Sequence, residues 1–261
     1  MRHLFFYLSI FTCIFSYSIL AKNSFSIAPT RVEIDLSKPK TESFVVFNNG
    51  DGPVRVEATI VYFPVNSKEM ENAEPLNEKV LNAADLSDHV KISPRVVSIA
   101  PGEQRVVRIS VRPSTELAEG EYRTHIMFKM LENAEVQTKK IDKSSGGNVG
   151  VKIAFKLEMA AAIIGIKGNP QIQLTAQCKM EKDYVSVIVE NPSLRRFDGD
   201  FSVSSDSNTK IHDQKFLIFP SSRKLLKLPL EKINPSKKIK LLFKQNSKNN
   251  QFSYENECTL I

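Results

Sequence analysis

Few side chains in this chain of 261 residues have the type and spacing that covalent or metal chemistry needs. The four histidines are His3 near the start and His89, His125 and His212, which lie far apart in the sequence. None of them forms the closely spaced pair of a zinc site, and no G-x-S-x-G, G-x-x-x-x-G-K-S/T or G-x-G-x-x-G motif occurs. We therefore expect no metal, no cofactor and no enzymatic activity. Catalytic residues that converge only in the folded chain are the alternative.

The cysteines allow one covalent cross-link. Cys13 lies in an apolar N-terminal run, which leaves Cys178 and Cys258 for the rest of the chain. In an oxidising compartment such a pair can form a disulfide, here joining the start and the end of the last third of the chain. Two separately buried thiols are the alternative.

The net charge of +7 falls by one to +6 if Arg2 is removed with an export signal. The basic residues are scattered, with a modest cluster in the last quarter of the chain, which is typical of a solvated face. Tryptophan is absent and no row of aromatic residues accompanies the lysines, so we do not expect nucleic-acid binding.

Residues 1–21 have the layout of a secretory signal peptide, because Arg2 is followed by an apolar run that ends near Leu20 and by the small residue Ala21. This predicts export and a mature chain that starts at residue 22. An uncleaved membrane anchor is the alternative, since the run is close to the lower length limit of a spanning helix. No later segment is long and apolar enough to cross a bilayer, so we expect the mature protein not to be embedded in a membrane.

The elements that must position these side chains are short β-strands. With 41% hydrophobic residues the chain can form two cores, and segments of alternating polarity follow one another between turn residues. The spacing predicts an all-β protein of two sandwiches, residues 22–167 and 168–261, with Gly168-Asn169-Pro170 as the linker. The polar stretch 132–148 ends in Ser-Ser-Gly-Gly-Asn and is expected to be a loop.

The segment after this loop, VGVKIAFKLEMAAAIIGIKG (149–168), is apolar at every second position from Val149 to Ile163. This period predicts a strand with one buried face rather than a helix. Ordinary strands have about 3 to 10 residues, so the row is longer than a single sandwich needs.

Four stretches together resemble the periplasmic pilus-assembly chaperones of the chaperone-usher family. They are APTRVEI (28–34), VKISPRVVSIAPGEQRVVRISV (90–111), GEYRTHIMFKM (120–130) and the alternating strand that follows the loop, while VENPS (189–193) fits the second domain. Each motif is short, and their order carries the likeness. The resemblance implies two immunoglobulin-like domains set at an angle.

The resemblance also implies a function in fimbrium biogenesis and pilus assembly. Such a chaperone donates an edge strand to a pilus or surface-fibre subunit whose own sandwich lacks its last strand, and it delivers the subunit to an outer-membrane usher. The subunit-binding donor residues implied here are Val151, Ile153, Phe155, Leu157 and Met159. The alternative is a structural or adhesive two-domain sandwich of the envelope, in which the long strand is entirely internal.

In the family, two basic residues between the domains hold the C-terminal carboxylate of the subunit. Arg31 in PTRVEI matches the first, and arginine suits the role because its guanidinium forms a bidentate pair with a carboxylate. The second would fall near Ile163 or Ile164, and neither is basic. Lys167 and Arg123 are candidates to replace it, with surface salt bridges as the alternative for both.

Overall fold

The structure is a computed structural model. It describes residues 23–64, 73–77, 84–131, 134–135, 154–205, 209–233, 238–247 and 250–260, so the segment assigned to the signal peptide lies outside it. The described residues form β-strands and two short 3-10 helices, η2 (Ser87–His89) and η3 (Leu230–Lys232), with no α-helix. No helix in the described part is long and apolar enough to cross a membrane.

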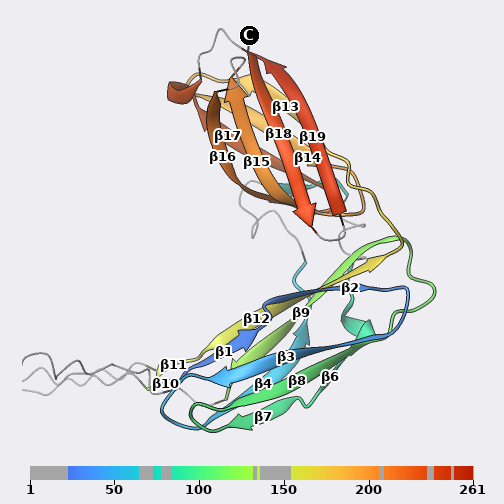
Figure 1. Ribbon diagram of the computed structural model, residues 1–261, viewed down its shortest axis with the longest axis vertical. Coiled ribbons are helices and arrows are strands. Elements are labelled where there is room, and N and C mark those ends of the chain that lie inside the picture. Colours follow the sequence, from blue (N-terminus) through green and yellow to red (C-terminus); the bar gives the residue numbers. More distant parts are fainter. Residues whose placement is uncertain are drawn as a thin grey trace, which may run out of the picture.

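The strands form two sandwiches that meet at an angle (Figure 1), which confirms the predicted fold class. In the first sandwich, a four-stranded sheet of order β1-β3-β8-β6 packs on a five-stranded sheet of order β2-β12-β9-β4-β7. The bounds of these strands are β1 Phe25–Ala28, β2 Arg31–Asp35, β3 Lys40–Asn48, β4 Val54–Val61, β6 Val90–Ser93, β7 Val96–Ile99, β8 Gln104–Val111, β9 Gly120–Met130 and β12 Glu158–Lys167. A two-stranded ladder of β10 (Ala134–Glu135) and β11 (Ala154–Phe155) precedes β12 along the chain.

Two strands of the first sandwich change sheets at a proline. β1 pairs with β3 in one sheet, and after Pro29 the chain continues as β2, which pairs with β12 in the other. β6 and β7 divide in the same way at Pro94. Proline has no N–H to donate to a ladder, so it favours such interruptions. The break at Pro29 determines where β2 begins to cover β12.

The second sandwich has two four-stranded sheets, of order β13-β14-β17-β5 and β16-β15-β18-β19. Their bounds are β5 Ala73–Pro75, β13 Thr175–Met180, β14 Tyr184–Asn191, β15 Phe197–Ser205, β16 Lys210–Ile218, β17 Ser222–Pro229, β18 Lys238–Ser247 and β19 Asn250–Thr259. Phe197, Phe201, Phe216 and Phe243 form its centre, and the rings of Phe201 and Phe243 lie 4.8 Å apart. The buried residues form two separate cores. The residues of the first core lie at or before Ile163 in the sequence, and those of the second lie at or after Ile172.

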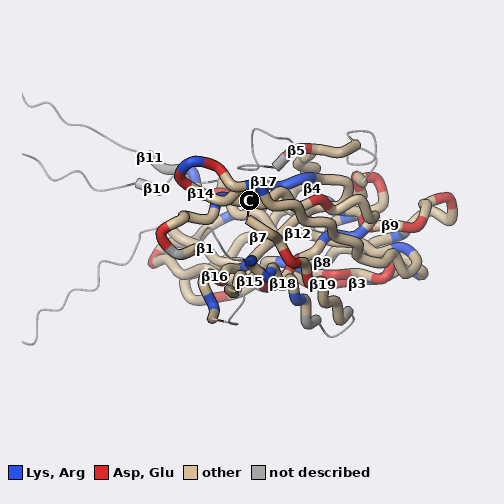
Figure 2. Tube along the Cα trace, turned by 90° about the horizontal axis from the view of Figure 1, so that it is seen from above, with Lys and Arg blue, Asp and Glu red and all other residues tan. Residues whose placement is uncertain are grey.

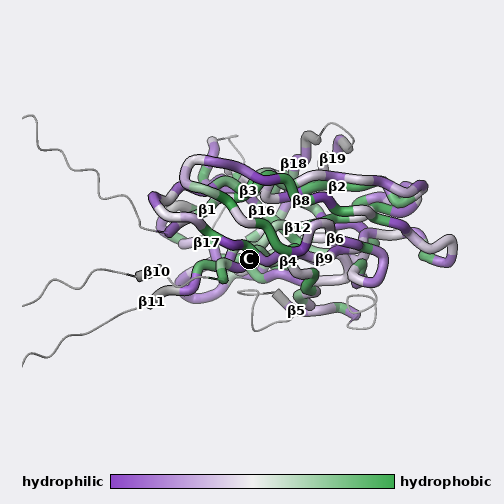
Figure 3. The backbone as a smooth tube through the Cα atoms, turned by 90° about the horizontal axis from the view of Figure 1, so that it is seen from below, coloured by the Kyte–Doolittle hydropathy of each residue, from purple (hydrophilic) through white to green (hydrophobic). Residues whose placement is uncertain are grey.

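Charge and hydropathy follow this layering. Basic and acidic residues are interspersed along the trace (Figure 2), as expected for solvated faces. Hydrophilic and hydrophobic stretches alternate along the trace, and both occur within strands (Figure 3). The buried residues therefore come from the inward positions of alternating strands.

Cys178 of β13 and Cys258 of β19 are joined by a disulfide that links the two sheets of the second sandwich, with their Cα atoms 5.9 Å apart. The bond closes a loop of 80 residues. A cross-link of this length restricts the unfolded chain, and losing it typically costs about 2–5 kcal/mol. We expect Cys178→Ser with Cys258→Ser to lower the free energy of unfolding by this amount in urea titrations. An unchanged denaturation midpoint would contradict this expectation.

The two sandwiches are connected by more than the chain between them. β5, which follows β4 of the first sandwich in the sequence, pairs antiparallel with β17 at the edge of the second. The Glu121 N–H donates to the Leu194 carbonyl at 2.9 Å, and the Asn169 N–H donates to Oε1 of Glu119 at 2.9 Å. These contacts hold the surface between the domains, where the candidate site lies.

Candidate functional site

The first part of the site is an edge of β12 that is only half covered. β9 pairs with β12 along all of Glu158–Lys167, but β2 pairs with it only from Ala162 to Ile166. On the side opposite β9, Glu158–Ala161 have no strand neighbour among the described residues. An unpaired edge of this kind is a template for another strand.

The hydrogen bonds show which backbone groups this edge presents. The Ala162 N–H donates to the Thr30 carbonyl, and the Ile166 carbonyl accepts from the Leu36 N–H. The backbone N–H and C=O groups of the even-numbered residues of β12 therefore point toward β2. The Leu157 carbonyl accepts from the Met130 N–H, so the backbone groups of the odd-numbered residues point toward β9. Because backbone groups alternate in direction along a strand, the N–H and C=O groups of Glu158 and Ala160 point to the open edge. Both residues are exposed.

The apolar row of this strand is buried to different degrees. Ala161 and Ile163 are fully buried in the first core, whereas Leu157 and Met159 are partly buried and pack against its border. Phe155 is described in its backbone, which pairs with Ala134. Val151 and Ile153 lie outside the described residues. The row thus changes from internal to half-exposed where β2 stops covering the edge, and its role in subunit binding stays a prediction.

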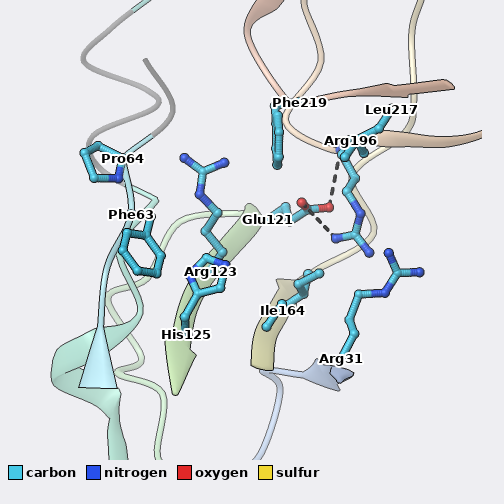
Figure 4. Close-up of a pocket in the computed structure, with 11 residues that line it drawn as sticks. Arg31, Phe63, Pro64, Glu121, Arg123, His125, Ile164, Arg196, Leu217 and Phe219 are labelled. Atoms are coloured by element: carbon cyan, nitrogen blue, oxygen red, sulfur yellow. Dashed lines mark hydrogen bonds and ion pairs between the residues drawn. The ribbon is translucent and has the colours of Figure 1, made fainter. Parts of the chain in front are cut away.

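The second part of the site is a cavity of about 280 Å³ between the two sandwiches (Figure 4). Arg31, the first residue of β2, and Arg123 of β9 both line it. Lys167, the last residue of β12, is paired with Gly120 and is not among the lining residues. Of the three candidate anchors, the fold therefore brings Arg31 and Arg123 together.

Arg123 lies next to the position of β12 at which the family resemblance implies a basic residue. It lies directly opposite Ile164 in the ladder, at a pair that is not hydrogen-bonded. Side chains in such pairs share a face of the sheet, with Cβ atoms about 4.5–5.5 Å apart. A guanidinium from β9 therefore reaches the space beside Ile164, which has no charge of its own.

Arg123 is 7% exposed, yet among the described residues no carboxylate forms an ion pair with it. Its Nη2 donates to the Tyr62 hydroxyl at 3.4 Å, and its guanidinium lies 4.8 Å from the Phe219 ring centre. Its Nε has no acceptor within the described ranges. Arginine stays protonated in proteins, and a buried charge without a counter-ion costs free energy. The cavity wall thus holds a cation that an anionic ligand would stabilise.

The acidic residues of the cleft pair with other arginines. Arg196 of the second sandwich is similarly buried, but its Nη1 lies 3.0 Å from Oε1 of Glu121 and it also pairs with Glu33 of β2. Nη1 of Arg31 donates to Oδ2 of Asp198 at 2.6 Å. Glu121 and Arg196 are 75 positions apart, and no local pattern in the sequence indicated this network.

His125 lines the same cavity, two positions from Arg123 on the same face of β9. Burial, and then the positive charge of Arg123, lower the pKa of His125 below its ordinary value of 6.5, so the imidazole is neutral at pH 7. Its ring contacts Phe63 edge-on at 4.9 Å between centres, and its Nδ1 has no hydrogen-bond partner in the part of the chain that the structure describes. Within the described ranges no group of His, Cys, Asp or Glu could hold a metal ion.

Known structures share this architecture. The class 5 fimbriae chaperone CfaA is 13% identical, with a TM-score of 0.51 over 90% of this chain and 99% of that one. The E. coli chaperone DraB is also 13% identical, with a TM-score of 0.51 over 90% and 97%. A chaperone-tip adhesin complex of CFA/I fimbriae biogenesis contains a match of 13% identity and TM-score 0.52 over 91% and 100%.

These likenesses place the molecule in a structural class: it has the two-sandwich fold of the fimbrial chaperones, as the sequence resemblance predicted. At this level of identity the likeness concerns the fold. No protein-family model and no curated protein matches the sequence.

Proposed function

We propose that this protein is a periplasmic chaperone that binds pilus or surface-fibre subunits by lending them the open edge of β12. The observation that carries the proposal is that the backbone groups of Glu158 and Ala160 have no partner among the described residues, at an edge that β2 covers only from Ala162 onward. A subunit that lacks its last strand would gain a backbone ladder from these groups and would place side chains beside the half-buried Leu157 and Met159.

The positive charge of Arg31 and Arg123 in the cavity determines the direction in which the partner strand runs. A strand that runs parallel to β12 along the open edge reaches Arg31 with its C-terminus, because Arg31 pairs with Ala162 at the point where β2 begins. An antiparallel strand would bring its N-terminal ammonium group toward Arg31 and Arg123, and like charges repel. The C-terminal carboxylate of the subunit is therefore the group that enters the cavity.

Arg123 supplies the second anchoring charge in this proposal, in place of the basic residue that the family has near Ile164. Arg123 is buried without a carboxylate partner among the described residues, which supports this role, and its guanidinium can form a bidentate pair with a carboxylate. Arg31 contributes from the other side of the cavity and exchanges its contact with Asp198 for the incoming carboxylate. Lys167 takes no part, because it lies outside the cavity lining.

The cellular setting belongs to the same proposal. Residues 1–21 direct the chain to the periplasm, where subunits appear unfolded after export, and an outer-membrane usher receives the loaded chaperone. The disulfide between Cys178 and Cys258 fits an oxidising compartment.

Photo-crosslinking from the open edge tests this function. With a photoreactive amino acid in place of Ala160, we expect cells of the source organism to yield an adduct with an exported β-rich protein that lacks its final strand. The same residue in place of Ser43, an exposed position of β3, is the control and should yield no such adduct. If position 160 crosslinks to no exported protein, the proposal is wrong, and a structural or adhesive role of the two-sandwich protein is favoured.

A further inference from the structure

The interdomain cavity has more apolar wall than a carboxylate anchor needs. Besides the arginines, it is lined by Phe63 and Pro64 after β4, Ile164 of β12, Leu217 of β16 and Phe219 in the turn that follows β16. Figure 4 shows Phe63 and Phe219 on the side of the cavity that Arg123 occupies, with Arg31 on the other side. A carboxylate alone would leave these apolar side chains in contact with water.

The volume of the cavity is also larger than a carboxylate group needs. An engineered apolar cavity of about 150 Å³ is sufficient to hold a benzene molecule, whereas this one has about 280 Å³. The space accommodates a side chain of aromatic size together with a carboxylate. The neutral imidazole of His125 adds a wall without charge.

We infer that the cavity selects the last residue of the captured subunit by its side chain, favouring an aromatic or large aliphatic group, an inference that rests on the proposed function. The terminal carboxylate pairs with Arg31 and Arg123, and the side chain of the same residue packs against the apolar wall that Phe63, Ile164 and Phe219 form. Two opposite chemistries in one cavity match the C-terminal residue of a protein, where a charge and an apolar side chain share one Cα atom.

Both sandwiches contribute to this selection. Phe63 and Ile164 come from the first, while Leu217 and Phe219 come from the second. The ion pairs of Arg196 with Glu121 and Glu33 hold these two walls in place. The second sandwich thereby contacts the last residue of the subunit, although the donated edge belongs to the first sandwich.

Binding of three synthetic peptides to the purified mature protein tests the inference. Each is N-acetylated, has twelve residues that alternate isoleucine and threonine, and ends in phenylalanine acid, glycine acid or phenylalanine amide. Burying a phenylalanine side chain predicts that the phenylalanine acid has a Kd roughly 10- to 100-fold lower than the glycine acid. The amide should bind more weakly than the phenylalanine acid, because it lacks the anchoring charge.

A matched pair of variants locates the effect. Phe63→Ser should raise the Kd of the phenylalanine acid by roughly threefold or more and leave that of the glycine acid unchanged. Phe47→Ser is the control, because Phe47 on β3 is 37% exposed, as Phe63 is at 38%, but does not line the cavity. It should change neither Kd.

The outcomes separate this inference from the proposed function. If both acids bind equally well and the amide is weaker, the carboxylate anchor stands and side-chain selection is refuted. Equal effects of Phe63→Ser on both acids would also refute it. If none of the three peptides binds, strand capture itself is refuted, and selection with it.

Discussion

Replacing Arg123 with methionine is expected to weaken binding of a carboxylate-terminated strand by roughly 30-fold or more while making the free protein more stable. Losing a buried charged partner costs about 2–5 kcal/mol of binding free energy. In the free protein, an unpaired buried charge costs several kcal/mol, which exceeds the roughly 0.5–2 kcal/mol returned by its contacts with the rings of Tyr62 and Phe219. Calorimetric titration with the phenylalanine acid peptide and urea unfolding measure the two effects.

Lys167→Met is the matched control for this substitution, because it also removes one positive charge from the same sheet but outside the cavity lining. It should leave peptide affinity within about twofold of the unsubstituted protein. Loss of stability in Arg123→Met with unchanged affinity would assign Arg123 a purely structural role, and the carboxylate anchor would then have to be sought elsewhere.

Replacing Ala160 with proline is expected to abolish strand capture and preserve the fold. The Ala160 N–H points away from β9, so its loss breaks no hydrogen bond of the sheet, and proline is tolerated on edge strands in this orientation. A partner strand, however, loses a ladder hydrogen bond and meets the proline ring where it should pair. We expect affinity for the phenylalanine acid peptide to fall on the order of 100-fold, with the unfolding midpoint little changed.

Ala161→Pro is the contrasting variant one position further on. The Ala161 N–H faces β9 inside the sheet, and the residue is fully buried in the first core. Proline there should lower the free energy of unfolding by about 2 kcal/mol or more, since it leaves a buried carbonyl of β9 unsatisfied. If Ala160→Pro binds the peptide with unchanged Kd, the partner does not use this edge.

The period of the apolar residues was sufficient to predict the strand that carries the open edge. Ala161 and Ile163 face the core, as the alternation indicated. The residues around Ala160 have high helix propensity, but they form a strand because packing against β9 outweighs local propensity. Alternation is a local property of the chain, so it can be read directly from the sequence. The same pattern does not indicate where the covering strand begins.

That boundary and the pairing of charges were decided only by the tertiary structure. β2 covers β12 from Ala162 onward because the chain changes sheets at Pro29, more than 100 positions earlier in the sequence, as the β2–β12 register shows. Glu121 and Arg123 are neighbours on one face of β9. Nothing local indicates that Glu121 pairs with Arg196 while Arg123 has no carboxylate partner in the described part of the chain.

The physical reason is that burial and ion pairing depend on which distant segments meet. Arginine and glutamate at any two positions have the same local signature whether they are solvated or enclosed, and their free energies differ only after water is excluded. The sequence by itself determined the strands and their buried faces. The meeting of two sandwiches determined which of its arginines is available to a partner.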